Sequence, residues 1–160
     1  MQQGYDREAP IGGGHNAKGE LAMTSLLNPY LSFRDNAREA MEFYRSVFGG
    51  DMQVMPFGEM AHDPSEKDKV MHAMLKAPNG FVLMGADTPV GMELRAGGGI
   101  SVSLSGEDDA ELRGYWNRLA EGGTVIYPLE KAPWGDSFGM LSDKFGTPWM
   151  VNIAGARLSE

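Results

Sequence analysis

The sequence contains no cysteine among its 160 residues. This absence excludes disulfide bonds, thiolate metal sites and a cysteine nucleophile. No apolar run reaches the roughly 18 residues of a membrane span, and the N-terminus lacks the basic and then apolar order of a secretory signal. Basic residues are also scarce, since 14 of them face 22 acidic residues and the formal net charge is −8. This balance argues against nucleic acid or an anionic membrane as a partner. We expect a soluble, cytoplasmic protein.

The first 23 residues differ in character from the rest of the chain. They include the polar, glycine-rich run 10–19, which has no hydrophobic period and therefore cannot repay the entropy of ordering. We predict a flexible tail over 1–23 and a single domain over 24–160. Met23 is a candidate for the native start, with an extension before it, and retention of Met1 in the natively expressed protein would contradict this hypothesis.

A strand and a helix are indicated after the tail. Residues 27–33 alternate between apolar and polar, which is typical of a strand with one buried face. Asn36 has Glu39 three residues later, the spacing of a capping box at a helix N-terminus. The apolar residues of 37–48 then follow at helical spacing and predict one buried stripe.

Paired glycines and three strands follow this helix. Gly49-Gly50 can take the positive φ that is needed where a helix stops. Asn79-Gly80 is a strong signal for a tight hairpin, because both positions tolerate positive φ. The predicted strands cover about 51–57, 69–77 and 81–87.

The second half of the chain repeats this order. Residues 100–105 alternate strictly, Asp108 with Glu111 repeats the capping-box spacing, and residues 112–120 carry an apolar helical stripe. Gly122-Gly123 ends that helix. Strands are then predicted over about 124–130, 137–142 and 148–153.

The offset between the two halves is nearly constant. Gly49-Gly50 and Gly122-Gly123 lie 73 residues apart, and Met55-Pro56 and Tyr127-Pro128 lie 72 apart. Such self-similarity indicates a duplicated supersecondary unit. We therefore predict an α+β fold of two βαβββ modules, module one over 26–90 and module two over 98–154. A single-layer α+β domain with accidental similarity is the alternative.

Eight fragments occur in an order and spacing that resemble one family: Pro29–Phe33, Ala40–Tyr44, Phe48–Gly50, Phe57–Met60, Met71–Ala73, Leu83–Asp87, Trp134–Asp136 and Asp143–Trp149. Together they resemble PhnB-like proteins of the vicinal oxygen chelate superfamily, over essentially 26–154. Lys144 stands where the family usually has proline. The superfamily includes glyoxalase I, dihydroxybiphenyl dioxygenases, and fosfomycin and bleomycin resistance proteins. The resemblance implies paired modules curved around a cup with the helices outside, in a homodimer, since members usually complete their cups by pairing or swapping modules.

The same group has also been labelled a demethylubiquinone methyltransferase. Methyl transfer requires a site for a methyl-donor nucleotide. The sequence shows no glycine-rich turn between a strand and a helix that would hold one. The resemblance therefore does not lead us to expect this chemistry.

The cup implied by the resemblance would be lined by the faces of the strands that point away from the helices. Trp134, followed by Gly135, would form part of the rim. The predicted ligand-binding residues are Tyr30, Ser32, Ser101, Ser103, Trp134, Met150 and Asn152.

Metal-dependent members of the superfamily hold a divalent ion with three or four His, Glu or Gln side chains. The resemblance puts Tyr30, Ser101 and Met150 at those positions. None is a usual ligand of a catalytic divalent metal, because the hydroxyls would have to be deprotonated and a thioether prefers soft ions. We predict no cofactor, while a divalent metal at another site stays open.

His72 is the one histidine inside a predicted strand. Its side chain could act as a general base, since its pKa ordinarily lies near neutral pH, or it could be a structural residue. Two functions remain open. The protein binds a small hydrophobic or aromatic molecule without turnover, or it is an enzyme of the lyase, isomerase or dioxygenase type. The enzyme would use a metal held in some other way, or His72 as its base.

Overall fold

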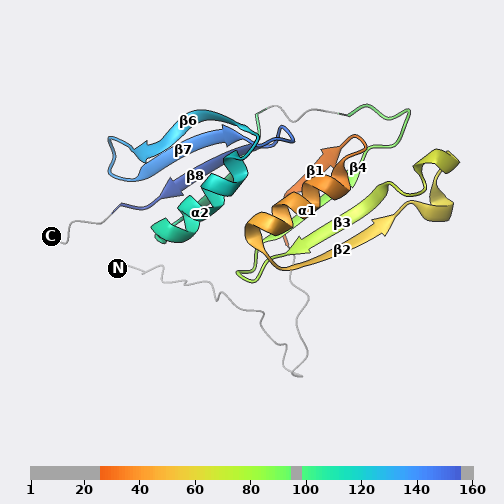
Figure 1. The fold of residues 1–160 in the computed structure, drawn as a ribbon, viewed down its shortest axis with the longest axis horizontal. Coiled ribbons are helices and arrows are strands. Elements are labelled where there is room, and N and C mark those ends of the chain that lie inside the picture. Colours follow the sequence, from red (N-terminus) through yellow and green to blue (C-terminus); the bar gives the residue numbers. More distant parts are fainter. Residues whose placement is uncertain (1–25, 95–98, 156–160) are drawn as a thin grey trace, which may run out of the picture.

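Two βαβββ units follow one another along the chain, as a computed structural model shows for residues 26–94 and 99–155 (Figure 1). Their strands form two four-stranded mixed sheets. The predicted α+β class and the duplication are confirmed. The flexible tail predicted over 1–23 lies outside the described residues.

Module one forms a sheet with the strand order β1-β4-β3-β2, here called sheet one. Strand β1 runs parallel to β4, and the other neighbours are antiparallel. Two short 3₁₀ turns, η1 (Gly58–Met60) and η2 (Pro64–Glu66), connect β2 to β3. The main elements are β1 (Tyr30–Phe33), α1 (Ala37–Phe48), β2 (Asp51–Pro56), β3 (Val70–Lys76) and β4 (Val82–Asp87).

Module two repeats this topology in sheet two, with the order β5-β8-β7-β6. Strand β5 pairs with β8 in parallel, as β1 pairs with β4. The elements are β5 (Val102–Gly106), α2 (Asp109–Ala120), β6 (Thr124–Lys131), β7 (Ser137–Ser142) and β8 (Pro148–Ile153).

Helix α1 is capped differently from the prediction. The capping box expected from Asn36 and Glu39 is wrong, because the Asn36 side chain makes no cap hydrogen bond. The backbone N–H of Ala37 donates instead to Oδ1 of Asp87 at 2.9 Å. Asp87 lies at the end of β4 and also accepts from the N–H of Val70 at 2.9 Å, so one buried carboxylate joins the helix to two strands. In α2 the predicted cap is present, since Asp108 accepts from the N–H of Glu111 at 3.0 Å.

The paired glycines stop the helices and also allow the chain to pass close to a strand. Gly49 ends α1 with a φ of 73°. At Gly50, whose φ is 99°, an added Cβ would stand 2.0 Å from the carbonyl oxygen of Lys76. At Gly123 an added Cβ would stand 2.4 Å from the carbonyl oxygen of Ser142. Each module therefore needs a residue without a side chain at this point.

Strand β6 departs from simple alternation. Its pairing with β7 is interrupted between Val125 and Tyr127 and again between Tyr127 and Glu130. Such bulges change which face a side chain occupies. Parity arguments from the sequence therefore hold for β5, β7 and β8 but not along β6.

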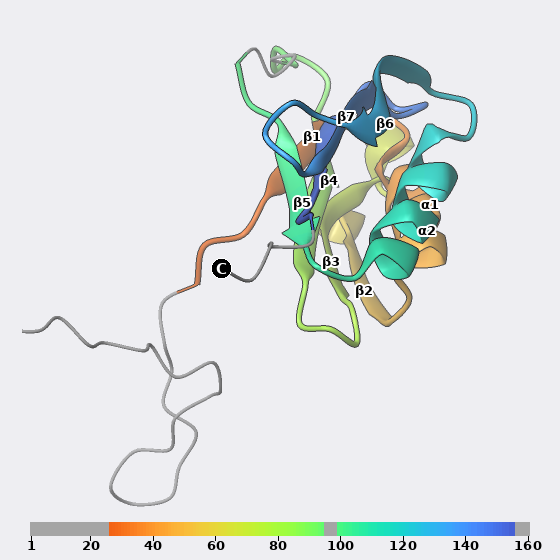
Figure 2. The ribbon, with the colours of Figure 1, turned by 90° about the vertical axis from the view of Figure 1, so that its left-hand side faces the viewer.

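The two helices lie side by side in Figure 1, and Figure 2 shows both on the same side of the sheets. Each helix carries a tyrosine that reaches the last hairpin of the other module. The hydroxyl of Tyr44 on α1 donates to Oδ2 of Asp143 at 2.7 Å and lies 3.0 Å from Oγ1 of Thr147. The indole N–H of Trp149 also donates to Asp143, at 2.9 Å. This buried group joins the modules.

The corresponding contact of α2 is more exposed. Tyr115, which is 71 residues after Tyr44, accepts from the amide of Asn79 in the β3–β4 turn at 3.1 Å. Its hydroxyl donates to Oε1 of Glu111 at 2.6 Å. Burial is the main cause that raises the pKa of Tyr115 to about 12, and the neighbouring Glu111 carboxylate adds to it. Burial and the Asp143 carboxylate raise the pKa of Tyr44 further. Both phenols stay neutral across the physiological range and make their contacts as neutral groups.

Within residues 26–94 and 99–155, no helix is both long and apolar enough to cross a membrane.

Candidate functional site

Each sheet has one face that packs against its helix and one face that does not, here called the helix-free face (Figure 2). Along β4 the side chains alternate, with Leu83 buried and Met84 half-buried. Along β8, Trp149, Val151 and Ile153 are buried in the core, as predicted. The predicted ligand residues of β1, β5 and β8 therefore lie on the helix-free faces.

On sheet one, the structure brings Tyr30 and His72 together. The Tyr30 hydroxyl lies 3.2 Å from Nδ1 of His72, and the two ring centroids are 5.7 Å apart. Tyr30 on β1 and His72 on β3 lie on either side of β4, so the contact between them crosses this strand. Burial raises the pKa of Tyr30, so its hydroxyl is neutral at physiological pH.

Three methionines surround this pair on the same face. Met55 is the cross-strand partner of His72. Met74 follows His72 by two residues on β3 and is the cross-strand partner of Met84, which in turn pairs with Tyr30. The face is therefore apolar and rich in thioethers, with one imidazole and one phenol.

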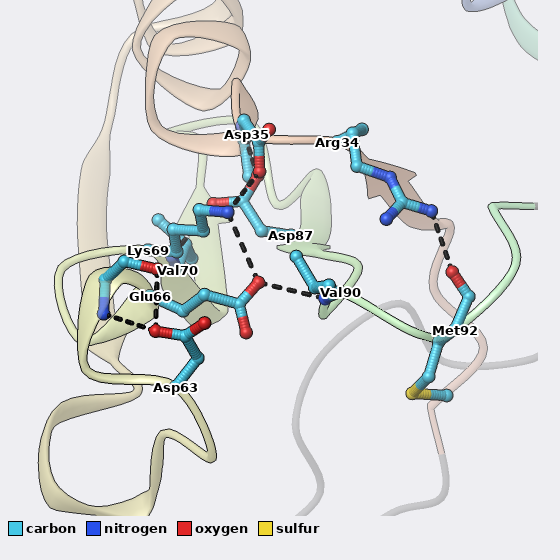
Figure 3. A network of polar contacts seen from close by, with 11 residues as sticks. Arg34, Asp35, Asp63, Glu66, Lys69, Val70, Asp87, Val90 and Met92 are labelled. Atoms are coloured by element: carbon cyan, nitrogen blue, oxygen red, sulfur yellow. Dashed lines mark hydrogen bonds and ion pairs between the residues drawn. The ribbon is translucent and has the colours of Figure 1, made fainter.

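The other predicted residue of module one, Ser32, lies apart from the Tyr30–His72 pair. It lines a shallow hollow with Ala86, Thr88 and Met92 beyond the end of β4. The chain near this hollow is held by Arg34, whose guanidinium donates to the carbonyl of Met92 at 2.7 Å (Figure 3). No contact links Ser32 to His72 among the interactions described for this module, and its ligand role stays a prediction.

A group of charged residues joins the β2–β3 connection to the segments that follow β1 and β4 (Figure 3). The buried Glu66 accepts from Lys69 at 3.2 Å and from the N–H of Val90 at 2.9 Å. Lys69 also lies 2.6 Å from Asp35. Because each carboxylate here already has a partner, the group fixes the chain rather than offering free ligands.

On sheet two, the predicted residues fall into two places. Met150 lies between Ser103 and Met140 across the helix-free face. The Asn152 amide donates to Oδ2 of Asp136 at 3.0 Å, which ties β8 to the β6–β7 connection.

Trp134 lies in that same β6–β7 connection. It is 64% exposed and packs edge-on against Phe138, with ring centroids 5.9 Å apart. It lines a separate surface hollow with Tyr127 and Pro133. A rim position for Trp134 agrees with this exposure but stays a prediction.

Ser103 lines a pocket between the two modules, here called the inter-module pocket. Its volume is about 290 Å³. Ser101 is exposed and precedes β5, outside the ladder. The pocket is lined by Pro29, Phe48, Leu75, Ala77, Phe81, Val82, Leu83, Val102, Ser103, Leu104, Ser105 and Trp149.

The walls of this pocket are apolar except for two hydroxyl groups. Phe48, at the end of α1, packs against Trp149 and Phe81, with ring centroids 5.7 and 6.0 Å apart. Ser103 and Ser105 on the edge strand β5 supply the polar atoms. The sequence did not identify the aromatic walls as site residues, because helical and strand periodicity mark them only as core.

A divalent metal of the superfamily type does not fit the residues at the expected positions. The Tyr30 hydroxyl lies within hydrogen-bond distance of His72, Ser101 lies outside the strand, and Met150 offers only a thioether. Within 26–94 and 99–155, no group of three His, Cys, Asp or Glu side chains is placed to hold an ion. No chemistry through such an ion follows from these residues.

Comparison with known proteins gives a consistent family. Residues 25–152 match a family described as 3-demethylubiquinone-9 3-methyltransferase. Protein PA1353 from Pseudomonas aeruginosa is 40% identical, with a TM-score of 0.74, over 83% of this chain and 100% of that chain. A putative 3-demethylubiquinone-9 3-methyltransferase, PhnB protein, from Bacillus cereus is 28% identical, with a TM-score of 0.67, over 81% of this chain and 100% of that one.

A more distant structure shares the fold alone. The glyoxylase/bleomycin resistance protein/dioxygenase domain from Frankia sp. EAN1pec is 16% identical, with a TM-score of 0.58, over 83% of this chain and 99% of that chain. Paired βαβββ modules of the vicinal oxygen chelate type are therefore the architecture of this chain, as the fragments of its sequence predict.

Proposed function

The chain belongs to the PhnB-like family described as 3-demethylubiquinone-9 3-methyltransferase, and from this premise we propose that it binds a small hydrophobic or aromatic molecule in the inter-module pocket. The observation that carries the proposal is the pocket itself, about 290 Å³ of mostly apolar space that both modules enclose. Apolar pockets with a few placed polar groups are the usual form of small-molecule sites.

The lining favours a neutral ligand with one hydrogen-bonding group. Phe48, Phe81 and Trp149 offer ring faces and edges, which suit an aromatic or branched apolar body. The hydroxyls of Ser103 and Ser105 can each donate and accept one or more hydrogen bonds. Because the lining residues include no charged side chain, an ion would lose its hydration without compensation.

Methyl transfer, the activity in the family's description, has little support in the loops of this chain. A methyl-donor nucleotide is commonly held by a glycine-rich turn between a strand and a helix. Here β1 leads into α1 through Arg34, Asp35 and Asn36, and β5 leads into α2 through Glu107 and Asp108. We therefore propose binding rather than methylation.

Replacing Ser103 with phenylalanine is expected to weaken ligand binding by about tenfold or more, because the added ring occupies pocket volume. The measurement is NMR titration with uncharged aromatic probes, indole and 2-naphthol, followed through the methyl groups of Leu75, Leu83 and Val102. Ser32→Phe is the matched control, since Ser32 is equally polar and exposed but lines another hollow. Equal binding by Ser103→Phe and the unmodified chain would contradict the pocket assignment.

A second candidate is an enzyme that uses His72 as a base, and the 3.2 Å contact with Tyr30 favours it. In the same titration, His72→Ala separates the two candidates. Unchanged probe binding together with lower stability leaves His72 a structural residue. If the unmodified chain converts a bound compound and a correctly folded His72→Ala variant does not, the enzyme is favoured.

We also propose that the protein works as a homodimer in the cytoplasm. Both modules expose large apolar side chains, among them Met55 on β2, Tyr127 on β6 and Trp134 in the β6–β7 connection. Exposed apolar side chains are typical of interaction sites where they lie together, as Tyr127 and Trp134 do around one hollow, and pairing of two copies would cover them. Sedimentation velocity at micromolar concentration is expected to give a dimer, and a monomer would contradict the proposal.

A further inference from the structure

The inter-module pocket lies along an edge of β5 and not against one face of this strand. Leu104 is buried in the core and Val102 packs against it, whereas Ser103 and Ser105 on the opposite face are exposed. All four residues line the pocket. Because successive side chains of a strand point to opposite faces, residues of both faces meet one space only along the edge of the strand.

This edge of β5 has no neighbouring strand. Sheet two has the order β5-β8-β7-β6, so β8 pairs with one edge of β5 and, among the described residues, no strand pairs with the other. Module one forms the other walls of the pocket but does not supply hydrogen bonds to this edge from Pro29. Proline has no N–H, and the Pro29 carbonyl already accepts from the N–H of Met84 at 3.1 Å. A free edge presents main-chain donors and acceptors.

The hydrogen bonds with β8 indicate which main-chain groups of β5 point toward the pocket. The carbonyl of Gly106 accepts from the N–H of Ala154 at 2.8 Å, so Gly106 directs its groups toward β8. Main-chain groups point to alternate edges from one residue to the next along a strand. Leu104 therefore also bonds toward β8, while Ser103 and Ser105 direct their N–H and C=O groups to the free edge. Each of these serines offers a donor and an acceptor side by side.

The duplicated register provides a matched position in module one. The carbonyl of Phe33 accepts from the N–H of Thr88 at 2.7 Å, as that of Gly106 accepts from Ala154. Ser32 is thus the counterpart of Ser105, 73 residues earlier in the chain. Its main-chain groups also point to a free edge, but Ser32 lines another hollow. It is therefore a suitable control position.

A ligand that bonds to such an edge needs a donor and an acceptor on one side of the molecule. A lactam meets this need, because its ring holds N–H and C=O side by side, whereas an open-chain secondary amide is trans and directs them apart. Phe48, Phe81 and Trp149 are among the walls of the pocket, which suits a flat aromatic ring system. The lining residues include no charged side chain, which favours a neutral molecule.

We propose that the inter-module pocket binds a neutral aromatic lactam through the main-chain groups of Ser103 and Ser105 at the free edge of β5. The ligand would pair with this edge as an added strand does. The inference rests on the proposed function, since it names the chemical class of ligand for the same pocket. It assigns recognition of the polar group to the main chain, and the serine hydroxyls are secondary.

The first test compares three uncharged probes on the unmodified full chain. 2-Quinolone is a lactam, 1-methyl-2-quinolone lacks the donor, and 2-naphthol carries a single hydroxyl on a ring system of the same size. We expect 2-quinolone to bind about tenfold or more tightly than either, because only 2-quinolone can form both main-chain hydrogen bonds. ¹H–¹⁵N HSQC titration measures the affinities, and 2-quinolone should shift the amide signals of Ser103 and Ser105 most.

The second test removes one main-chain donor. Ser105→Pro takes away the N–H at the free edge and keeps the bonds with β8, since proline is tolerated in an edge strand where its nitrogen faces away from the sheet. The preference for 2-quinolone over 2-naphthol should be lost in this variant. Ser105→Ala, which removes only the hydroxyl, should keep the preference, and so should Ser32→Pro on β1. If Ser105→Pro does not fold, the comparison of 2-quinolone with 1-methyl-2-quinolone decides.

The outcomes separate this inference from the proposed function. Equal affinity for all three probes in the pocket would overturn the lactam assignment and leave the proposed function standing. If no probe shifts the methyl signals of Leu75, Leu83 and Val102, both proposals fail. A preference for 2-quinolone that survives in a folded Ser105→Pro variant would show that the main-chain N–H does not select the ligand, and it would overturn the inference.

Discussion

Replacing Asp143 with alanine is expected to lower the free energy of unfolding by roughly 3–5 kcal/mol. Asp143 is buried and accepts four hydrogen bonds, two of them from the N–H groups of Phe145 and Thr147 at 2.9 and 3.0 Å. The other two come from the side chains of Tyr44 and Trp149. Alanine removes every acceptor, leaves the buried N–H groups of Thr147 and Trp149 without partners, and leaves the Tyr44 hydroxyl with Thr147 alone. Urea denaturation of both proteins measures the difference.

Asp63→Ala is the matched control for this loss. Asp63 also accepts hydrogen bonds, from the backbone and side chain of Ser65 at 2.9 and 2.8 Å, but it lies in an exposed loop. We expect a small effect, because water replaces the missing acceptor. A loss no larger for Asp143→Ala than for Asp63→Ala would show that the inter-module hydrogen bonds contribute little.

The same contacts predict how stability depends on pH. Burial raises the pKa of Tyr115 from 10.0 to about 12, and that of Tyr44 is raised as well. A phenol with a raised pKa in the fold gives stability that is present below pH 10 and is lost as the pH rises through the folded pKa. The free energy of unfolding should therefore fall between pH 10 and 12, and less steeply in Tyr115→Phe. An unchanged slope in that variant would contradict this origin.

Replacing Gly50 with alanine is expected to cost roughly 3 kcal/mol or more, or to prevent folding. The new Cβ would stand 2.0 Å from the carbonyl oxygen of Lys76, and that oxygen belongs to the backbone and cannot rotate away. Lys76 pairs with Asp51 at the start of β2, so the clash separates β2 from β3. Thermal and urea denaturation, with an HSQC spectrum to confirm the fold, measure the effect.

Gly80→Ala isolates the conformational part of that cost. Gly80 also has a positive φ, of 89°, but an added Cβ there meets no atom within 4 Å. We expect a loss of about 1 kcal/mol, from the backbone conformation alone. Equal losses at Gly50 and Gly80 would mean that the contact with Lys76 relaxes and that only φ matters.

Local periodicity was enough to predict the elements whose side chains alternate cleanly. The strands expected over 137–142 and 148–153 have these bounds in the structure, because their two faces meet different surroundings. The cap of α1 was not predictable in this way. Asp87, which replaces Asn36 as the cap, lies 50 residues from Ala37 in the chain. Only the folded sheet brings them together.

For the candidate site, the sequence predicted only which face of its strand each side chain occupies. Alternation placed Tyr30 and Ser103 on faces away from the helices, and the structure agrees. Which of these residues meet depends on how the modules pack, and no local pattern records this. Phe48 and Trp149 have the periodicity of core residues and are core residues, yet they also form walls of the inter-module pocket. The Tyr30–His72 contact joins residues 42 positions apart in the chain and crosses β4.

The crossed tyrosine contacts have an evolutionary consequence. Two identical modules would have made two identical contacts, but the copies have diverged where they touch. The turns at Ala77 and Asp143 close with the same backbone hydrogen bonds, yet Ala77 offers no carboxylate to α2. The modules have thereby become complementary parts with different roles. A gene that encoded either half twice would lack one partner of the buried contact, so the duplication is no longer reversible by simple loss of a copy.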